Sequence, residues 1–457
     1  AFWDSKGLIT PEAYRRFCGP TVPLLRMSKR TYTDDETFTA KAEITHFGAK
    51  DIANASPKWL ITDKAGKMIA SGSFPKCKIA TGGLTDLGEI SVPLVNVKAP
   101  AELIVTLSLA GSKVSNDWHI WVYPTEVDTS APEGVLVTES VDDAVSALKQ
   151  ARKVVLLASS RTLVSSRPGS FTPVFWSPIL FKAQAAKSMG ILCDTVHPAL
   201  ADFPTDSYTN WQWYDLLNSS RMMVLDGTPA DFHPIVQFID NFMKNQKLGG
   251  LFEARVGEGK LIVCSFDLKT DVEKRPAARQ LLKSILDYAA SPTFEPYQRL
   301  TLEELSKIVG EPKQTFLQKI GAVITADSED TADGNLAANI MDGDPETIWH
   351  TEWAASTPPF PHEVKIELPE AIEITGFRCL PRQDMSNGWF TDYEFYASND
   401  GKSWEDPIAK GTFASGADES IVRFDKPVRA RYFRLVGLKG YQNNPWAAIA
   451  EFDLIRP

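Results

Sequence analysis

The sequence has no long hydrophobic run and no recognisable targeting segment. None of its stretches contains eighteen or more uncharged apolar residues, which is about the length that a membrane-spanning helix needs. The amino terminus also lacks a charged segment followed by an apolar core, the pattern of a secretory signal peptide. We therefore expect a chain without membrane insertion that is either mature or truncated at its start.

Positive charge is scarce as well. The chain has 48 Lys and Arg against 58 Asp and Glu, so its formal net charge is −10. Nucleic-acid binding depends on clustered Lys and Arg that neutralise phosphates, and an anionic membrane surface attracts basic segments. The composition therefore argues against nucleic acid and membrane as partners.

Cysteine is sparse and shows no pairing pattern. The five cysteines are widely scattered, and no C-x-x-C spacing occurs among Cys18, Cys77, Cys193, Cys264 and Cys379. An odd, scattered set predicts neither a zinc site nor a disulfide framework. Most of these cysteines have apolar neighbours, and we expect them to be small buried hydrophobic side chains.

Length and tryptophan content, in contrast, are high. A chain of 457 residues predicts roughly three domains. Several of the 12 tryptophans lie in polar, turn-rich surroundings such as Asn210-Trp-Gln-Trp-Tyr214. Exposed indole rings suit the flat C–H faces of sugars, although large aromatic side chains more often help to pack a core.

The first 125 residues contain a helical segment followed by a strand-rich region. Thr10-Pro-Glu-Ala-Tyr-Arg-Arg-Phe-Cys18 begins with a Thr N-cap and a Pro at the first helical position, which predicts a helix. Residues 27–125 show short alternating strands separated by Gly, Asp, Asn and Pro clusters. This spacing predicts an immunoglobulin-like β-sandwich, in which His119 on the last strand is a structural side chain.

Strands and helices alternate in residues 133–292. We expect strands over 134–138, 153–158 and 222–225, helices over 142–151, 235–244 and 277–290, and a hairpin over 251–265. Such alternation predicts an α/β flavodoxin-like domain with a doubly wound sheet. Residues 293–322 then form a connector that contains a helix over 300–309.

This middle region resembles the amidotransferase-like domains appended to some galactosidases. A nucleophile of that kind is a Cys on a Gly-flanked turn between a strand and a helix. Cys193 lacks such glycines, and His197 is its neighbour only in sequence. We expect a scaffold, with an active site in this domain, hydrolase or transferase, as the alternative.

The most informative motif is Met341-Asp-Gly-Asp-Pro-Glu-Thr-Ile-Trp-His-Thr-Glu-Trp353, which Ala447-Ala-Ile-Ala-Glu-Phe-Asp453 complements about a hundred residues later. Carboxylate oxygens in a tight loop suit Ca²⁺, and Glu451 returns from the far end of the domain to complete the shell. Asp-Gly is also ordinary turn chemistry. The spacing therefore leaves a metal site and a simple turn open.

Further motifs recur in order along the same segment. They are Cys379-Leu-Pro-Arg-Gln383, Tyr393-Glu-Phe-Tyr-Ala-Ser-Asn-Asp-Gly-Lys-Ser-Trp404, Arg431-Tyr-Phe-Arg-Leu435 and Ala448-Ile-Ala-Glu-Phe452. With them, residues 323–457 resemble a discoidin (coagulation factor 5/8 type C) domain, most closely carbohydrate-binding module family 32. The resemblance implies a discoidin-type β-sandwich jelly roll with ligand-binding loops at one rim. Trp349, Trp404 and Tyr432 would then belong to its core.

The resemblance also assigns roles to single residues. A structural Ca²⁺ would be held by Asp342, Asp344, Thr347 and Glu451, with backbone carbonyls near Asn339. A galactose-type sugar would contact His350, Trp353 and Arg382, and Asn387, Trp389 and Trp446 would widen the site. A glutamate that some relatives use on the 382–390 loop has no clear counterpart, which leaves strict galactose selectivity open.

Residues 1–26 resemble the closing β/α unit of the barrel in glycoside hydrolase family 2, of the β-galactosidase or β-glucuronidase type. Trp3 would come from the active-site wall of a catalytic barrel that precedes this chain. Two carboxylates on that barrel would perform the hydrolysis, so we expect no catalytic residue here.

The predicted function is therefore that of a non-catalytic, carbohydrate-binding C-terminal region of a large polysaccharide-degrading glycoside hydrolase. We expect a bacterial protein that is secreted, periplasmic or at the cell surface, with a plant or host glycan as its partner. An adhesive discoidin protein is the remaining alternative.

Overall fold

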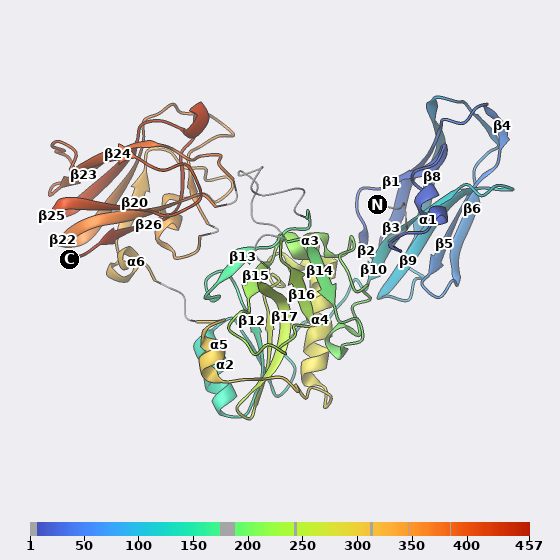
Figure 1. Cartoon of the computed structure of the whole chain (residues 1–457), viewed down its shortest axis with the longest axis horizontal. Coiled ribbons are helices and arrows are strands. Elements are labelled where there is room, and N and C mark those ends of the chain that lie inside the picture. The colour runs from blue at the N-terminus through green and yellow to red at the C-terminus, as the bar shows by residue number, and fades with distance from the viewer. Residues whose placement is uncertain (1–6, 174–187, 242–244, 311–313, 346, 384) are drawn as a thin grey trace. The chain divides into compact units, whose positions relative to one another are not determined.

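The computed structural model describes residues 7–173, 188–241, 245–310, 314–345, 347–383 and 385–457. They form two compact units. The first contains the described residues up to 305 apart from 158–166, and the second contains 158–166 and the residues from 306 onward. Strands dominate both units, as Figure 1 shows, and no helix among the described residues is long and apolar enough to cross a membrane.

The first unit begins with a helix of one turn, α1 (Pro11–Arg15). The hydroxyl of Thr10 accepts a hydrogen bond from the Ala13 N–H at 3.2 Å, as the N-cap pattern predicts. No side chain of α1 is buried. Trp3 lies outside the described residues, so the resemblance of this segment to the end of a barrel stays a prediction.

A β-sandwich follows α1. One sheet contains β1 (Thr21–Arg26), β3 (Thr37–His46) and β8 (Gly83–Pro93), and the other β2 (Thr31–Thr33), β10 (Ser115–Tyr123), β9 (Ala101–Leu109), β5 (Pro57–Asp63) and β6 (Met68–Ser73). Strands β4 (Ile52–Ala55) and β7 (Cys77–Ile79) form a separate pair. Leu103, Val105 and Leu107 are buried because alternate residues of a strand point to the same face. Strand β1 precedes residue 27, so the sandwich takes its first strand from the segment predicted to end the barrel.

The middle part of the first unit is a mixed sheet of nine strands rather than a doubly wound one. Strands β11 (Val135–Thr138), β12 (Lys153–Leu157) and β18 (Gly259–Cys264) are parallel, whereas β17 (Lys247–Val256), β15 (Arg221–Val224), β16 (Val236–Ile239) and β14 (Gly190–Cys193) are joined by antiparallel pairs. Two short strands, β13 (Ser166–Pro168) and β19 (Arg299–Leu300), complete it. The predicted flavodoxin-like pattern is therefore present only in part, as the unit β11–α2–β12.

The helix predicted over 235–244 is wrong at its start, because Val236–Ile239 form strand β16. Val236 and Phe238 are fully buried while Gln237 and Ile239 are half-buried, which is the alternation of a strand. Strand β16 pairs with β14 on one side and β17 on the other. Periodicity alone does not distinguish a short apolar run of this kind from a helix, and the strand partners decide the outcome.

The described helices of this region are α2 (Val141–Lys149), α3 (Trp213–Asn218) and α4 (Pro276–Ala290). Helix α4 lies along the sheet (Figure 1) and buries Leu281 and Ile285 against it. Trp121 and Tyr123 of β10 belong to the same hydrophobic cluster. The sandwich and the mixed sheet thus share one core, which makes the first unit a single packed body.

The second unit is a C-terminal β-sandwich. Its strands are β20 (Val323–Ala326), β21 (Trp349–His350), β22 (His362–Pro381), β23 (Asp392–Ser398), β24 (Ala409–Thr412), β25 (Ser420–Gly437) and β26 (Ala448–Ile455). The rings of Phe395 and Phe433 stack in its core with centroids 5.8 Å apart. Helix α5 (Leu302–Ser306) is the helix expected in the connector, and α6 (Phe316–Ile320) buries Leu317 in the core of this sandwich.

Of the three aromatic residues expected in this core, only Trp349 is fully buried. Trp404 and Tyr432 are half-buried, so the prediction for them is wrong. The guanidinium groups of Arg434 and Arg431 lie over their rings, at 4.6 Å and 5.2 Å from the centroids. The aromatic rings at these two positions bind arginine side chains on the outside of the sheet.

Candidate functional site

The acidic loop that follows the 3₁₀ helix η3 (Ala337–Met341) is a tight turn. Gly343 has a φ of +82°, a conformation that favours glycine. One carboxylate oxygen of Asp342 accepts a hydrogen bond from the Asp344 N–H at 2.8 Å, and the other accepts from the Thr347 hydroxyl at 2.8 Å. The turn is therefore stabilised by its own side chains, as its Asp-Gly sequence indicates.

Glu451 on β26 faces this turn. Both of its carboxylate oxygens are buried, and neither has a hydrogen-bond partner among the described residues. Burial, and then the charges of Asp342 and Asp344, raise the pKa of Glu451 to about 9. Burial also raises the pKa of Asp342. The mutual repulsion of these carboxylates in a buried setting outweighs the opposing charge of Arg378 at Glu451, which disfavours the ionised form of that residue.

The oxygen atoms of these side chains are the kind of ligand that a hard cation prefers, but their positions do not form a closed site. Within the described ranges, no three Cys, His, Asp or Glu side chains converge closely enough to hold a metal ion. The amide of Asn339 donates to the carbonyls of Gly334 and Ile348, each at 2.9 Å, and its own carbonyl accepts from the Asp342 N–H. Asn339 thus supports the loop, and a closed calcium shell would need the carboxylates to move together.

His350 lies at the centre of a second group of residues. It sits on β21 opposite Ala448 of β26, and only 2% of its surface is exposed. Its Nδ1 is 2.6 Å from the carbonyl oxygen of Thr351. Because a carbonyl only accepts, this contact places the proton of a neutral ring on Nδ1 and makes Nε2 an acceptor.

Trp353 carries an indole ring in the segment that follows this histidine. The side chain is 49% exposed, and its Nε1 donates to a carboxylate oxygen of Asp330 at 3.0 Å. The N–H of Asp330 in turn donates to the carbonyl of His350. Glu352 accepts hydrogen bonds from the N–H groups of three consecutive residues that begin at Trp353. These hydrogen bonds therefore fix the orientation of the indole ring and of the backbone that carries it.

Asp330 was not identified from the sequence. It is fully buried and lies eleven residues before the motif begins at Met341, where nothing in the local pattern marks it. Hydrogen bonds from Asn335 and Trp353 outweigh the effect of burial and lower its pKa, so it is a charged acceptor. Only the fold brings it between the two predicted sugar contacts.

Gly388, on the loop before β23, packs directly against Ala448 and His350. The Ala448 N–H donates to the Gly388 carbonyl at 2.7 Å. A Cβ atom at Gly388 would lie 2.5 Å from that of Ala448 and 3.3 Å from the imidazole ring. Since Gly388 also has a φ of +87°, only glycine fits this approach.

The same loop is closed by Trp389, whose indole N–H donates to the carbonyl of Arg382 at 2.8 Å. Its ring lies 5.7 Å from that of Tyr441, in the 3₁₀ turn η4 (Tyr441–Asn443). The ring of Trp446 lies 6.4 Å from that of His350. Asn387 Oδ1 and Trp446 Nε1 are both buried and lack a hydrogen-bond partner among the described residues. Unsatisfied buried polar atoms of this kind commonly face a ligand or water.

The structure therefore brings together three segments that carry predicted sugar contacts. They lie on β21 and the loop after it, on the 382–390 loop and on the segment before β26. His350, Trp446 and Gly388 are in direct proximity, and Trp353 is connected to them through Asp330.

Cys193 and His197, the residues considered for an alternative site in the middle domain, do not form a catalytic pair. Burial raises the pKa of the Cys193 thiol to about 12, which opposes a reactive thiolate. His197 uses Nδ1 to accept from the Ala199 N–H, and its Nε2 lies 3.6 Å from Glu253. The histidine is thus directed at a carboxylate and a backbone group, and no Cys–His pair forms between these two residues.

Comparison with family models divides the chain into three parts. Residues 323–452 match the F5/8 type C domain. Residues 36–124 and 136–310 match two domains of unknown function, DUF8488 and DUF8487 respectively. The C-terminal part is therefore an F5/8 type C domain, and the family models assign no function to the other two.

Among curated proteins, a sialidase from Micromonospora viridifaciens is 36% identical over 155 residues, which cover 32% of this chain and 24% of the sialidase. A galactose oxidase from Gibberella zeae is 32% identical over 159 residues, which cover 34% of this chain and 23% of the oxidase. The chain thus spans about a quarter of the length of these relatives.

Solved structures with similarity to this chain include a family 32 carbohydrate-binding module from Clostridium perfringens in complex with GalNAc-β-1,3-galactose. It is 32% identical, covers 29% of this chain and 94% of its own, and has a TM-score of 0.28. A second family 32 module from C. perfringens, in complex with galactose, is 29% identical, with 29% and 92% covered and a TM-score of 0.27.

Proposed function

Because residues 323–452 are an F5/8 type C domain, we propose that this chain binds carbohydrate at the three segments around His350. The observation that carries this proposal is their convergence on one half-exposed indole and on two buried atoms, Asn387 Oδ1 and Trp446 Nε1, that have no hydrogen-bond partner among the described residues. Such a set provides an apolar face and directed hydrogen bonds, which is what a sugar ring requires. We propose a galactose-type sugar, the ligand class bound by two similar modules.

Each side chain has a distinct part in this proposal. Trp353 stacks against the apolar face of the ring, and Nε2 of His350 accepts a hydrogen bond from a sugar hydroxyl. Arg382 donates from the neighbouring loop, and Asn387 Oδ1 accepts. Trp389 and Trp446 extend the surface, with Trp446 Nε1 as a further donor. A single shallow site of this kind gives a Kd on the order of 0.1–1 mM.

We also propose that Ca²⁺ orders this domain. Asp342, Asp344 and Glu451 would supply carboxylate oxygens, with Thr347 and the backbone near Asn339 beside them. A bound cation would neutralise the buried charge that raises the pKa of Glu451, and would tie the acidic loop to the last strand. Its contribution is structural, since no reacting group lies beside it.

We propose further that the chain is the C-terminal, non-catalytic part of a larger bacterial glycoside hydrolase of the family 2 type, secreted, periplasmic or at the cell surface. Two observations support this: the resemblance of the first residues to a barrel end, and the occurrence of a matching region within larger enzymes. In such an enzyme the module keeps the catalytic domain close to its polymer, which raises the effective substrate concentration.

The deciding experiment is a glycan-array screen of the full chain, followed by calorimetric titration with galactose and galactose-containing oligosaccharides. His350→Ala and Trp353→Ala should each weaken binding by about tenfold or more. Trp404→Ala, an aromatic substitution in the same domain but outside the three segments, should leave binding unchanged. If no glycan binds, or if the first two variants bind like the wild type, the proposed site is incorrect.

A further inference from the structure

A second histidine of the C-terminal sandwich, His362, is almost completely buried. It begins strand β22, only 1% of its surface is exposed, and its ring packs against the ring of Phe360, with centroids 4.8 Å apart. Its Nδ1 lies 3.0 Å from a carboxylate oxygen of Asp327, and its Nε2 lies 3.3 Å from the carbonyl oxygen of Pro445. His362 therefore connects the residue that follows β20 to the segment that precedes β26.

Both ring nitrogens of His362 face oxygen atoms that accept hydrogen bonds. A carbonyl oxygen and an ionised carboxylate have no proton to donate. A neutral imidazole carries a single N–H, so either neutral form leaves the lone pair of one nitrogen directed at an acceptor. The imidazolium donates from both nitrogens, and the carboxylate of Asp327 favours its positive charge. The geometry around His362 therefore fits the doubly protonated ring.

Asp327 supplies the charge that faces this ring. It also accepts a hydrogen bond from the Glu363 N–H at 2.8 Å, which fixes its position. The Glu363 side chain points to the other face of β22, where it pairs with Lys365 at 2.8 Å. Strand β25 places Gly437 opposite His362, and the segment before β26 contributes a carbonyl oxygen and no charge. Among the described residues, Asp327 is thus the charged group in contact with the ring.

The segment that His362 contacts carries Trp446 of the proposed sugar site. Pro445 directly precedes Trp446, and the ring of Trp446 lies 6.4 Å from that of His350. The Trp446 N–H donates to the side-chain oxygen of Asn444 at 3.1 Å. A displacement of the Pro445 carbonyl therefore changes the position of the Trp446 indole relative to His350.

Two further hydrogen bonds join the ends of this segment to the other parts of the site. The side-chain amide of Asn444 donates to the carbonyl of Trp389 at 3.3 Å. The Ala447 N–H donates to the hydroxyl of Thr351 at 3.2 Å. Between these two points, the carbonyl of the proline lies against the buried histidine. The histidine thus supports the middle of the segment, next to the tryptophan.

We propose that His362 is a positioning residue of the sugar site and makes the affinity of that site depend on pH. The inference rests on the proposed carbohydrate-binding function and assigns a form of regulation to the same site. When the ring is doubly protonated, Nε2 donates to the Pro445 carbonyl and holds Trp446 beside His350. When the ring loses one proton, the shorter contact with Asp327 keeps the remaining N–H on Nδ1, and Nε2 no longer donates. The segment before β26 then loses its central support, and the sugar loses part of its binding surface.

The first test is calorimetric titration of the full chain with galactose at constant ionic strength, from about pH 5 to about pH 8, where histidine ordinarily titrates. The wild type should bind about fivefold more weakly at the upper end of this range. His362→Gln should show the weaker affinity at every pH. Asp327→Asn should move the loss of affinity to lower pH, because the ring loses the carboxylate that favours its charged form.

The comparison needs two controls. His350 titrates as well, but it is present in every protein compared, so its effect is common to the wild type and the His362→Gln variant. His46→Gln removes a buried histidine of the other unit, whose Nε2 likewise lies 2.9 Å from a backbone carbonyl. This variant should bind galactose with the affinity and the pH dependence of the wild type.

A second measurement, NMR spectroscopy of the chain with ¹⁵N-labelled histidine and tryptophan, does not depend on sugar binding. At the lower end of the pH range the ring of His362 should show two N–H protons. The indole N–H resonance of Trp446 should move as that ring titrates, in the absence of any sugar. His362→Gln and Trp446→Phe identify the two sets of signals.

Two results would overturn the proposal. One is galactose binding whose affinity changes with pH in parallel in the wild type and in His362→Gln. The other is a Trp446 resonance that does not follow the titration of His362, or a His362 ring with a single N–H proton throughout the range. If galactose and its oligosaccharides bind at no pH, the proposed function is wrong, and the NMR titration still decides whether the ring controls the segment. Circular dichroism of each variant ensures that a loss of binding is not a loss of folding.

Discussion

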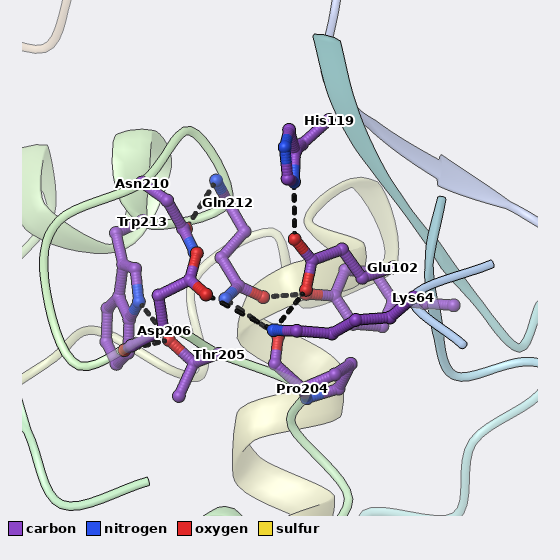
Figure 2. A network of polar contacts seen from close by, with 10 residues as sticks. Lys64, Glu102, His119, Pro204, Thr205, Asp206, Asn210, Gln212 and Trp213 are labelled. Atoms are coloured by element: carbon purple, nitrogen blue, oxygen red, sulfur yellow. Dashed lines mark hydrogen bonds and ion pairs between the residues drawn. The ribbon is translucent and has the colours of Figure 1, made fainter. Parts of the chain in front are cut away.

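The hydroxyl of Tyr123 donates a hydrogen bond of 2.6 Å to Oε1 of Gln212, and both side chains are buried. Tyr123 ends the last strand of the sandwich, whereas Gln212 precedes α3 in the middle domain. The Gln212 amide group also donates to the Pro204 carbonyl at 2.9 Å (Figure 2). This pair connects two sequence regions that match different family models, and together with the shared hydrophobic core it makes them one unit.

Tyr123→Phe should lower the free energy of unfolding of the first unit by about 1–3 kcal/mol. The change leaves the Gln212 oxygen buried without its donor, and an unsatisfied buried acceptor costs that amount. Urea denaturation followed by fluorescence measures it, with Tyr297→Phe as the exposed control. A loss no greater than that of the control would show that the hydrogen bond contributes nothing.

The pair of His119 and Glu102 should make stability depend on pH. The hydrogen bond with Glu102, opposed by burial and supported by the charges of Glu102, Asp117 and Asp206, raises the pKa of His119 above 6.5. A raised pKa in the folded protein stabilises it fully below pH 6.5, and this contribution is lost as the pH rises through the folded pKa.

The melting temperatures of the wild type and of His119→Gln should therefore differ most near pH 6 and converge above neutral pH. Differential scanning calorimetry at several pH values measures the difference. A constant difference across that range would contradict the assignment of the charge to His119.

Glu451→Gln should have opposite effects with and without calcium. In EDTA the variant should be more stable than the wild type, because it removes a buried carboxylate that lacks a partner in the described structure. With Ca²⁺ at about a hundred times its Kd, the wild type should gain about 2.7 kcal/mol. The variant should gain little, because it lacks one of the proposed ligands.

Thermal unfolding in EDTA and in millimolar CaCl₂ distinguishes these cases. A wild-type melting temperature that calcium leaves unchanged would exclude the calcium proposal without affecting the sugar site.

Gly388→Ala should disturb the sugar site without removing any sugar contact. The added Cβ would lie 2.5 Å from that of Ala448 and would impose a φ of +87° on alanine, so a loss of about 1–3 kcal/mol of stability is expected. Affinity for galactose oligosaccharides should fall as the loop moves away from His350. The double variant Gly388→Ala with Ala448→Gly relieves the contact but not the backbone strain, so calorimetric titration should show partial recovery. Full affinity in the single variant would show that the close approach is unimportant.

Sequence patterns predicted the C-terminal sandwich well, because its strands alternate and its motifs are local. The turn at Asp342 follows from its local sequence. Gly343 permits the positive φ that the turn requires, and the Asp342 carboxylate accepts a hydrogen bond from the Asp344 N–H. The same holds for the helix begun by Thr10 and Pro11. These features depend on residues within a few positions of one another.

The mixed sheet was predicted less well, because its elements depend on residues that are distant in the chain. Whether Ile235-Val-Gln-Phe-Ile239 becomes a helix or a strand depends on β14 and β17, which lie elsewhere in the chain. In the same way, Trp404 and Tyr432 carry aromatic side chains typical of a core, yet they bind arginines on its surface.

The sequence by itself determined the F5/8 type C motifs and the residue types of the candidate sites. Only the tertiary structure decided which of two tryptophans two positions apart, Trp211 and Trp213, is exposed, and that Asp330 connects Trp353 to His350 by hydrogen bonds. The reason is physical: propensity and turn chemistry act over a few residues, whereas burial and hydrogen-bond partners are set by segments that are distant in the chain.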